Sequence, residues 1–177
     1  MIPKSGNRFS DKIMRQEKTF TNALTERLAG FIREIGIDVR SAQLPERTFL
    51  PGLDIRDGVI LVDEDKLDHP GDLLHEAGHL AVTEPASRNV PSLAPTDAEE
   101  MATLAWSWAA LTYLDLDPAV VFHPGGYKGG GQSLIDAFAG GGGPGTPMLQ
   151  WYGMTVTGKA AAEQGVAPFP HMLRWLR

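Results

Sequence analysis

Residues 72–82 read DLLHEAGHLAV and contain the pattern His-Glu-x-x-His. The residues around the pattern are mostly uncharged, which predicts a helix buried on both flanks. Side chains four positions apart lie one above the other on a helix, so His75 and His79 can offer two nitrogen atoms to one cation. Glu76 lies one step around the helix from His75, beside such a cation without having to bind it. The pattern therefore predicts a metal site on this helix.

The two histidines also indicate which metal and which chemistry to expect. Two imidazoles suit a borderline-soft divalent ion, and zinc is the usual occupant of such sites. Zinc with three protein ligands and an open position lowers the pKa of a bound water molecule to about 7, and a neighbouring carboxylate then accepts the proton. We therefore predict a zinc hydrolase with Glu76 as the general base. The alternative is a buried amphipathic helix with two incidental histidines.

The composition narrows the class of protein. The chain has 177 residues, of which 42% are hydrophobic and 21% are charged, which suits one soluble globular domain. We divide it into a flexible tail at residues 1–10 and a single domain at residues 11–177. The net charge of -6, without a basic patch, argues against a nucleic-acid partner.

Cysteine usage and hydropathy bear on the compartment. The chain has no cysteine, so it has neither a disulfide framework nor a thiolate metal site. It also has no signal-type apolar run near the N-terminus and no run of roughly 18 apolar residues. We therefore expect a cytoplasmic protein without a membrane partner.

Upstream of residue 72, the sequence predicts one helix and then short strands. Apolar residues recur at helical spacing from Asp11 to Ile35, most clearly from Thr21 onward, and Gly36 ends the pattern. Strands are predicted at 37–39, 48–55 and 59–62, with the hairpin signal Asp-Gly at 57–58 between the last two. The fold class is therefore α+β: a mainly helical domain with a small antiparallel sheet or hairpin before the metal helix.

Downstream, residues 96–99 read Thr-Asp-Ala-Glu, a capping box that begins a helix reaching about residue 114. Glycine-rich loops follow at 123–131 and 140–145, and short helices are predicted at 133–139 and 147–152. The apolar and basic segment 170–177 is expected to pack back on the domain. We expect Trp108 in the core, and we favour the core over a cleft for Trp151.

A catalytic zinc site needs a third protein ligand, and the start of this second helix supplies Asp97, Glu99 and Glu100. Glu99 already has a role in the capping box. Glu100 shares a helical row with Leu104 and Trp108, which predicts that it points toward the core, where a carboxylate is costly unless it meets a cation. We favour Glu100 as the ligand and keep Glu99 as the second choice. The alternative is that all three acids only favour the positive end of the helix dipole.

Two further side chains are candidates for catalysis. A hydrolase uses a donor opposite the metal to hold the developing oxyanion. His123 and Tyr127 lie in the glycine-rich loop 123–131, and either side chain would suit this role. The alternative is a plain turn in which Tyr127 packs on the core. We expect His69 to be an incidental surface histidine.

The order of these features resembles a known class of enzymes. An apolar strand, Val59-Ile60-Leu61-Val62-Asp63, precedes His75-Glu76-Ala77-Gly78-His79, and a helix beginning Glu99-Glu100-Met101-Ala102 follows. Over residues 55–115 this order is similar to that of the bacterial ImmA/IrrE-type zinc metallopeptidases, and more broadly to that of the zincins of the HExxH-plus-Glu type. The resemblance implies a zincin-like domain and a third ligand a few residues before an Ala, which fits Glu99 by strict spacing.

The chain also departs from that family. It has Ala105-Trp106 and Leu114-Asp115-Leu116-Asp117-Pro118 where the family has an aromatic-Ala pair and a Leu-Leu-Met-Pro ending, and no helix-turn-helix segment is evident. Two functions remain open. The first is a zinc metallopeptidase that acts on a peptide or protein substrate. The second is a non-catalytic zinc-binding zincin scaffold, a binding or regulatory module in which a fourth protein ligand such as His123 closes the site.

Overall fold

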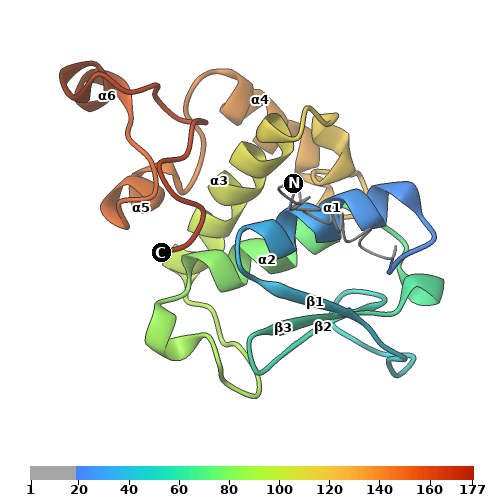
Figure 1. The fold of residues 1–177 in the computed structure, drawn as a ribbon. Helices are drawn as coiled ribbons and strands as arrows, with labels where there is room; N and C mark the ends of the chain where they lie inside the picture. Colours follow the sequence, from blue (N-terminus) through green and yellow to red (C-terminus); the bar gives the residue numbers. More distant parts are fainter. Residues whose placement is uncertain (1–18) are drawn as a thin grey trace, which may run out of the picture.

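The computed structural model describes residues 19–177, and over this range the fold is α+β (Figure 1). The predicted tail at 1–10 and the first part of the predicted N-terminal helix, residues 11–18, lie outside the described residues. The helices are α1 (Ala23–Glu34), α2 (Asp72–Val82), α3 (Asp97–Tyr113), α4 (Gly131–Ala139), α5 (Thr146–Trp151) and α6 (Gly158–Gln164). The strands are β1 (Asp38–Ser41), β2 (Leu53–Arg56) and β3 (Val59–Val62).

The strands form a mixed sheet in the order β1-β3-β2. The hairpin at Asp57-Gly58 is confirmed: both residues have positive φ, as a tight two-residue turn requires, and β2 pairs antiparallel with β3. The expectation of a purely antiparallel sheet is wrong, because β1 pairs parallel with β3. The apolar strand β3 takes the centre, so the chain crosses from β1 to the far edge and the hairpin then returns β3 in the direction of β1.

The predicted strand at 48–55 is shorter in the structure. β2 begins only at Leu53, because Pro51 and Gly52 form a turn. Gly52 has a φ of +73°, and a Cβ atom there would lie 2.6 Å from the carbonyl oxygen of Asp63. The turn therefore packs tightly against the end of β3, and only glycine fits this position without strain.

Helix α2 lies between α1 and α3, and α1 and α2 cover the sheet (Figure 1). Gly78 permits the close packing of α2 on α3, since a Cβ atom at that position would lie 2.9 Å from Cγ2 of Thr103 and 3.3 Å from the ring of Trp106. Trp106 is fully buried and Trp108 nearly so, as predicted for Trp108. This packing brings the first turns of α3 beside the histidines of α2.

The segment after α3 agrees with the sequence in part. Helices α4 and α5 lie where they were predicted, whereas α6 was not predicted. The C-terminal segment packs back on the domain: the backbone N–H of Arg177 donates to the carbonyl of Ala81, and the indole N–H of Trp106 donates to that of Trp175. Trp151 is 83% exposed, so its expected place in the core is wrong. None of the helices within residues 19–177 combines the length and apolar character that crossing a bilayer requires.

Candidate metal centre

The two histidines of α2 present their ring nitrogens to the same point. The Nε2 atoms of His75 and His79 lie 3.1 Å apart. In a tetrahedral zinc site, two nitrogen ligands each at about 2.0–2.1 Å from the ion lie roughly 3.4 Å from one another. The spacing of four residues on one helix therefore gives a nitrogen pair close to the separation that zinc requires.

The third donor comes from α3. Oε1 of Glu100 lies 3.9 Å from Nε2 of His79, and one ligand atom from each of His75, His79 and Glu100 lies within 4.8 Å of the others. Among residues 19–177, no other set of three histidine or acidic side chains has its ligand atoms this close together. The alternative ligand Glu99 is engaged elsewhere, because its carboxylate accepts hydrogen bonds from the backbone N–H and the hydroxyl of Thr96, both at 2.9 Å. Asp97 does not belong to the group.

Glu100 lies at the boundary between the core and the cleft. Its side chain is 47% exposed, so the expectation that it points inward with an apolar stripe is wrong. Its carboxylate is therefore the more exposed member of the pair that it forms with His79, whose side chain is buried.

A hydroxyl group lies beside the outer nitrogen of each histidine. The hydroxyl oxygen of Tyr127 is 3.4 Å from Nδ1 of His75, and that of Thr103 is 3.3 Å from Nδ1 of His79. Histidines that bind metals usually donate the N–H of their other ring nitrogen to a partner, which fixes the tautomer and the ring orientation. With Nδ1 protonated, Nε2 carries the free lone pair on both rings.

The sequence analysis missed Thr103. A signal was present: Thr103 lies three residues after Glu100 on the same helix, so the two side chains share a face. Reading that face as a ligand followed by its supporting hydroxyl would have singled out Thr103.

Burial keeps both imidazoles neutral. It lowers the pKa of His75 to about 3, with a smaller effect from neighbouring His79, and it lowers the pKa of His79 to about 4. Only a neutral imidazole has a lone pair for a metal. The histidines are therefore in the ligand form throughout the neutral pH range.

The pKa of Glu76 differs from that of an ordinary glutamate. Burial raises the pKa of Glu76 to about 7, and the nearby carboxylates of Asp72, Glu100 and Asp54 act in the same direction. A carboxylate with a pKa near neutrality both accepts and releases protons at physiological pH. In this environment Glu76 suits proton transfer.

An open cleft of about 480 Å³ reaches this group. Glu76, His79 and Glu100 line the cleft together with the edge strand β2, the segment just before β2 and the loop before α3. The lining residues are Phe49, Leu50, Leu53, Asp54, Ile55, Glu76, His79, Ser92, Leu93, Pro95 and Glu100. Tyr127 does not line this cleft, and its contact with Nδ1 of His75 favours a role in orienting that ring over the expected role as an oxyanion donor.

His123 lies outside the metal group. It is buried, and its Nε2 atom lies 3.0 Å from Oδ1 of Asp72 in the first turn of α2. His69, expected as an incidental surface residue, stacks on His123 with ring centroids 3.7 Å apart. His123 therefore connects the glycine-rich loop to α2 through Asp72. This connection lies four residues before Tyr127 in the chain.

Comparisons of the chain with models of protein families, with curated proteins and with solved structures found no match. The function is therefore inferred from the residues and their geometry.

Proposed function

We propose that this protein is a zinc-dependent hydrolase, most specifically a metallopeptidase of the zincin type. The observation that carries the proposal is the position of Glu76 beside the group formed by His75, His79 and Glu100, at one wall of an open cleft. We propose the peptidase activity, as opposed to another hydrolysis, because the order of sequence features resembles that of the ImmA/IrrE-type metallopeptidases.

The three donors fit zinc by their chemistry and spacing. Two neutral imidazoles and one carboxylate form a common ligand set of catalytic zinc, and such a set leaves a position for water or substrate. A bound zinc ion would supply Lewis acidity, which lowers the pKa of water and polarises a carbonyl group. Tyr127 and Thr103 would hold the two rings in the ligand orientation.

Glu76 is the group that moves the proton. In the hydrolysis of an amide, its carboxylate takes a proton from the attacking water molecule as the new C–O bond forms. The same carboxyl group then gives that proton to the leaving nitrogen as the C–N bond breaks. The buried position of Glu76 raises the pKa of its carboxyl group, which favours its accepting a proton, and a zinc ion beside it would favour the ionised form that acts as the base.

The shape of the cleft supports an extended peptide as the substrate. Residues Leu53–Ile55 of β2 line the cleft, and β2 is an edge strand of the sheet. An edge strand offers backbone groups to which an extended chain can add by strand pairing. The N–H of Leu53 already donates to the carbonyl of Leu50, so such a chain would add along β2 after Leu53. A peptide aligned in this way would pass beside Glu76 and His79.

The position of His123 favours an enzyme over a non-catalytic zinc module. A structural zinc site has four protein ligands. His123 was the candidate for the fourth ligand, and its Nε2 atom is engaged with Asp72. Among residues 19–177, no fourth histidine or acidic side chain joins the group of three.

The test combines metal analysis with turnover. We expect the purified protein to hold one zinc ion and to cleave members of a peptide library. Glu76→Gln should retain the zinc and reduce turnover by about 100-fold or more, because only the proton-transferring group is lost. His75→Ala should lose the zinc. Unchanged turnover in Glu76→Gln would overturn the mechanism, and an absence of zinc in the wild-type protein would overturn the proposal.

A further inference from the structure

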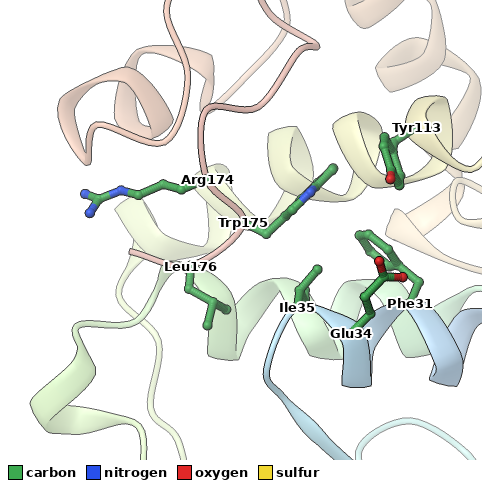
Figure 2. A pocket seen from close by; sticks show the side chains of 7 residues that line it. All are labelled: Phe31, Glu34, Ile35, Tyr113, Arg174, Trp175 and Leu176. Carbon is green, nitrogen blue, oxygen red and sulfur yellow. The ribbon is translucent and has the colours of Figure 1, made fainter. Parts of the chain in front are cut away.

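Phe49 is an exposed aromatic residue at the proposed catalytic cleft. It is 95% exposed, and it lines the same cleft as Glu76. The exposed ring of Tyr113 has a different environment, because it packs against the rings of Phe31 and Trp175 (Figure 2). The fold leaves the ring of Phe49 uncovered, so a ligand of the cleft would gain the hydrophobic free energy of covering it.

The turn that carries Phe49 is held by hydrogen bonds. The backbone N–H of Leu53 and the hydroxyl group of Thr48 both donate to the carbonyl of Leu50, at 3.1 Å and 2.5 Å. These bonds involve residues on both sides of Phe49. The ring therefore projects from an ordered turn, and a peptide in the cleft would meet it without a prior rearrangement of the chain.

Further apolar side chains line the cleft from two other elements. Leu53 and Ile55 of β2 are buried, whereas Leu93 and Pro95 belong to the loop before α3. A large apolar side chain in the cleft would contact these residues together with the ring of Phe49, and it would lose its contact with water on several sides. A small side chain such as that of alanine offers less apolar surface and would gain less.

The charged residues of the lining disfavour an acidic ligand. They are Asp54, Glu76 and Glu100, and no lysine or arginine from residues 19–177 belongs to the lining. The side chain of Arg56 lies outside the lining and pairs with Asp54 at 2.6 Å, and Arg47 also lies outside it. A carboxylate of a substrate side chain would therefore meet Glu76 and Glu100 without a cationic side chain of the lining to pair with.

We propose that Phe49 is a specificity-determining residue. Its ring packs on a large apolar side chain of the substrate next to the bond that is cleaved, and an acidic side chain at that position is disfavoured. The substrate class is an extended peptide with an aliphatic or aromatic residue beside the scissile bond. This inference rests on the proposed hydrolase activity and names its substrate class.

The first experiment measures cleavage by the zinc-loaded full chain. Peptides that differ at a single position compete in one reaction, and mass spectrometry gives kcat/KM for each of them. We expect the value for leucine or phenylalanine next to the cut to exceed that for alanine by about 10-fold or more, and the value for aspartate to fall below that for alanine. Cleavage without a preference for an apolar residue would overturn the inference and leave the proposed function standing.

Variants test the contribution of the ring. Phe49→Ala should lower the ratio of kcat/KM between the leucine and the alanine peptide by about threefold or more, and Phe49→Leu should retain most of this ratio. A loss of folded protein would not produce this result, because it lowers both values equally. Tyr113→Ala removes an exposed ring outside the cleft and should leave the ratio unchanged. An unchanged ratio in Phe49→Ala would overturn the assigned role of Phe49.

A binding measurement separates this inference from the proposed function. The ¹⁵N-labelled variant Glu76→Gln is titrated with acetyl-Ala-Ala-Leu-Ala-Ala-amide or acetyl-Ala-Ala-Asp-Ala-Ala-amide, and NMR follows the amide signals of Leu53 and Leu93. We expect the leucine peptide to shift both signals and to bind at least about threefold more tightly than the aspartate peptide. If the wild type cleaves no peptide, this result still supports the apolar subsite, whereas equal binding of the two peptides would overturn it.

Discussion

The hydroxyl oxygen of Thr103 on α3 lies 3.3 Å from Nδ1 of His79 on α2. This contact joins the two helices that supply the candidate ligands. It lies on one side of the His79 ring, and the Nε2 atom on the other side faces His75 and Glu100. Because Thr103 is fully buried, its hydroxyl has no access to water as an alternative partner.

Thr103→Val should therefore weaken zinc binding by about 10- to 100-fold while the fold is retained, since the substitution removes only the group that orients His79. Competition with a chelator of known affinity measures the change. Thr112→Val on the same helix is the matched control, because the hydroxyl of Thr112 donates to the carbonyl of Trp108 and not to a histidine. Equal zinc affinity in the two variants would contradict the assigned role of Thr103.

Alanine substitutions at Glu99 and Glu100 should affect two different properties, stability and zinc binding. Glu100→Ala should lose zinc, because its carboxylate is the third donor, and it should leave the capping box intact. Glu99→Ala should keep zinc and lower the free energy of unfolding by about 0.3–1.5 kcal/mol, because the N-terminus of α3 loses its reciprocal cap. Metal analysis and urea denaturation of both variants check this pair. Loss of zinc in Glu99→Ala alone would reverse the assignment.

The carboxylate of Glu64 gives a pH dependence to stability. Hydrogen bonds from the backbone N–H groups of Thr21 and Asn22, just before α1, lower the pKa of Glu64 below its ordinary value. A carboxyl group with a lowered pKa in the folded state stabilises the fold above its unfolded pKa, and this contribution is lost as the pH falls through the folded pKa.

Glu64→Gln should therefore be less stable than the wild type at pH 7, and the difference should shrink in acid. Urea midpoints measured from pH 7 down to about pH 3 follow this difference. A gap between the two proteins that stays constant over this range would show that the ionised carboxylate is not the source of the stability.

Gly145, at the N-terminus of α5, should not tolerate a side chain. Its φ is +78°, and a Cβ atom there would lie 1.7 Å from the carbonyl oxygen of Met101 on α3. Gly141→Ala is the matched control, because Gly141 has a φ of +85° but no atom within 4 Å of the same position. Gly141→Ala should cost about 1–2 kcal/mol from the backbone conformation alone, and Gly145→Ala should cost clearly more. Thermal denaturation of both variants measures the difference, and equal costs would contradict the tight contact between α5 and α3.

The parts of the fold that depend on local interactions follow from the sequence. The helical character of residues 72–82, the capping box of α3 and the turn at Asp57-Gly58 all rest on neighbouring residues, and the structure has each of them as predicted. The parallel pairing of β1 with β3 was missed, because it depends on where a long loop carries the chain. No local pattern specifies such a non-local pairing.

The candidate site shows the same division. The spacing of His75 and His79 fixes their common face, so their proximity follows from the helix alone. Glu100 was chosen for an inward orientation that it does not have, and it reaches the group from the exposed edge instead. The spacing from Glu100 makes Thr103 a candidate, but its contact with His79 depends on how α3 packs against α2. The contact of Tyr127 with His75 depends on the packing of a loop against α2, which no local sequence pattern encodes.

The division of the donors between two helices also has a mechanical consequence. Two of the three belong to α2, whereas Glu100 is the one that a cation would draw in from α3. An ion bound there would link the two helices. Its free energy of binding would therefore stabilise the packing of α3 on α2 and not either helix by itself. Chelation should then speed hydrogen exchange first in the opening turns of α3, while the amides in the middle of α2 remain protected.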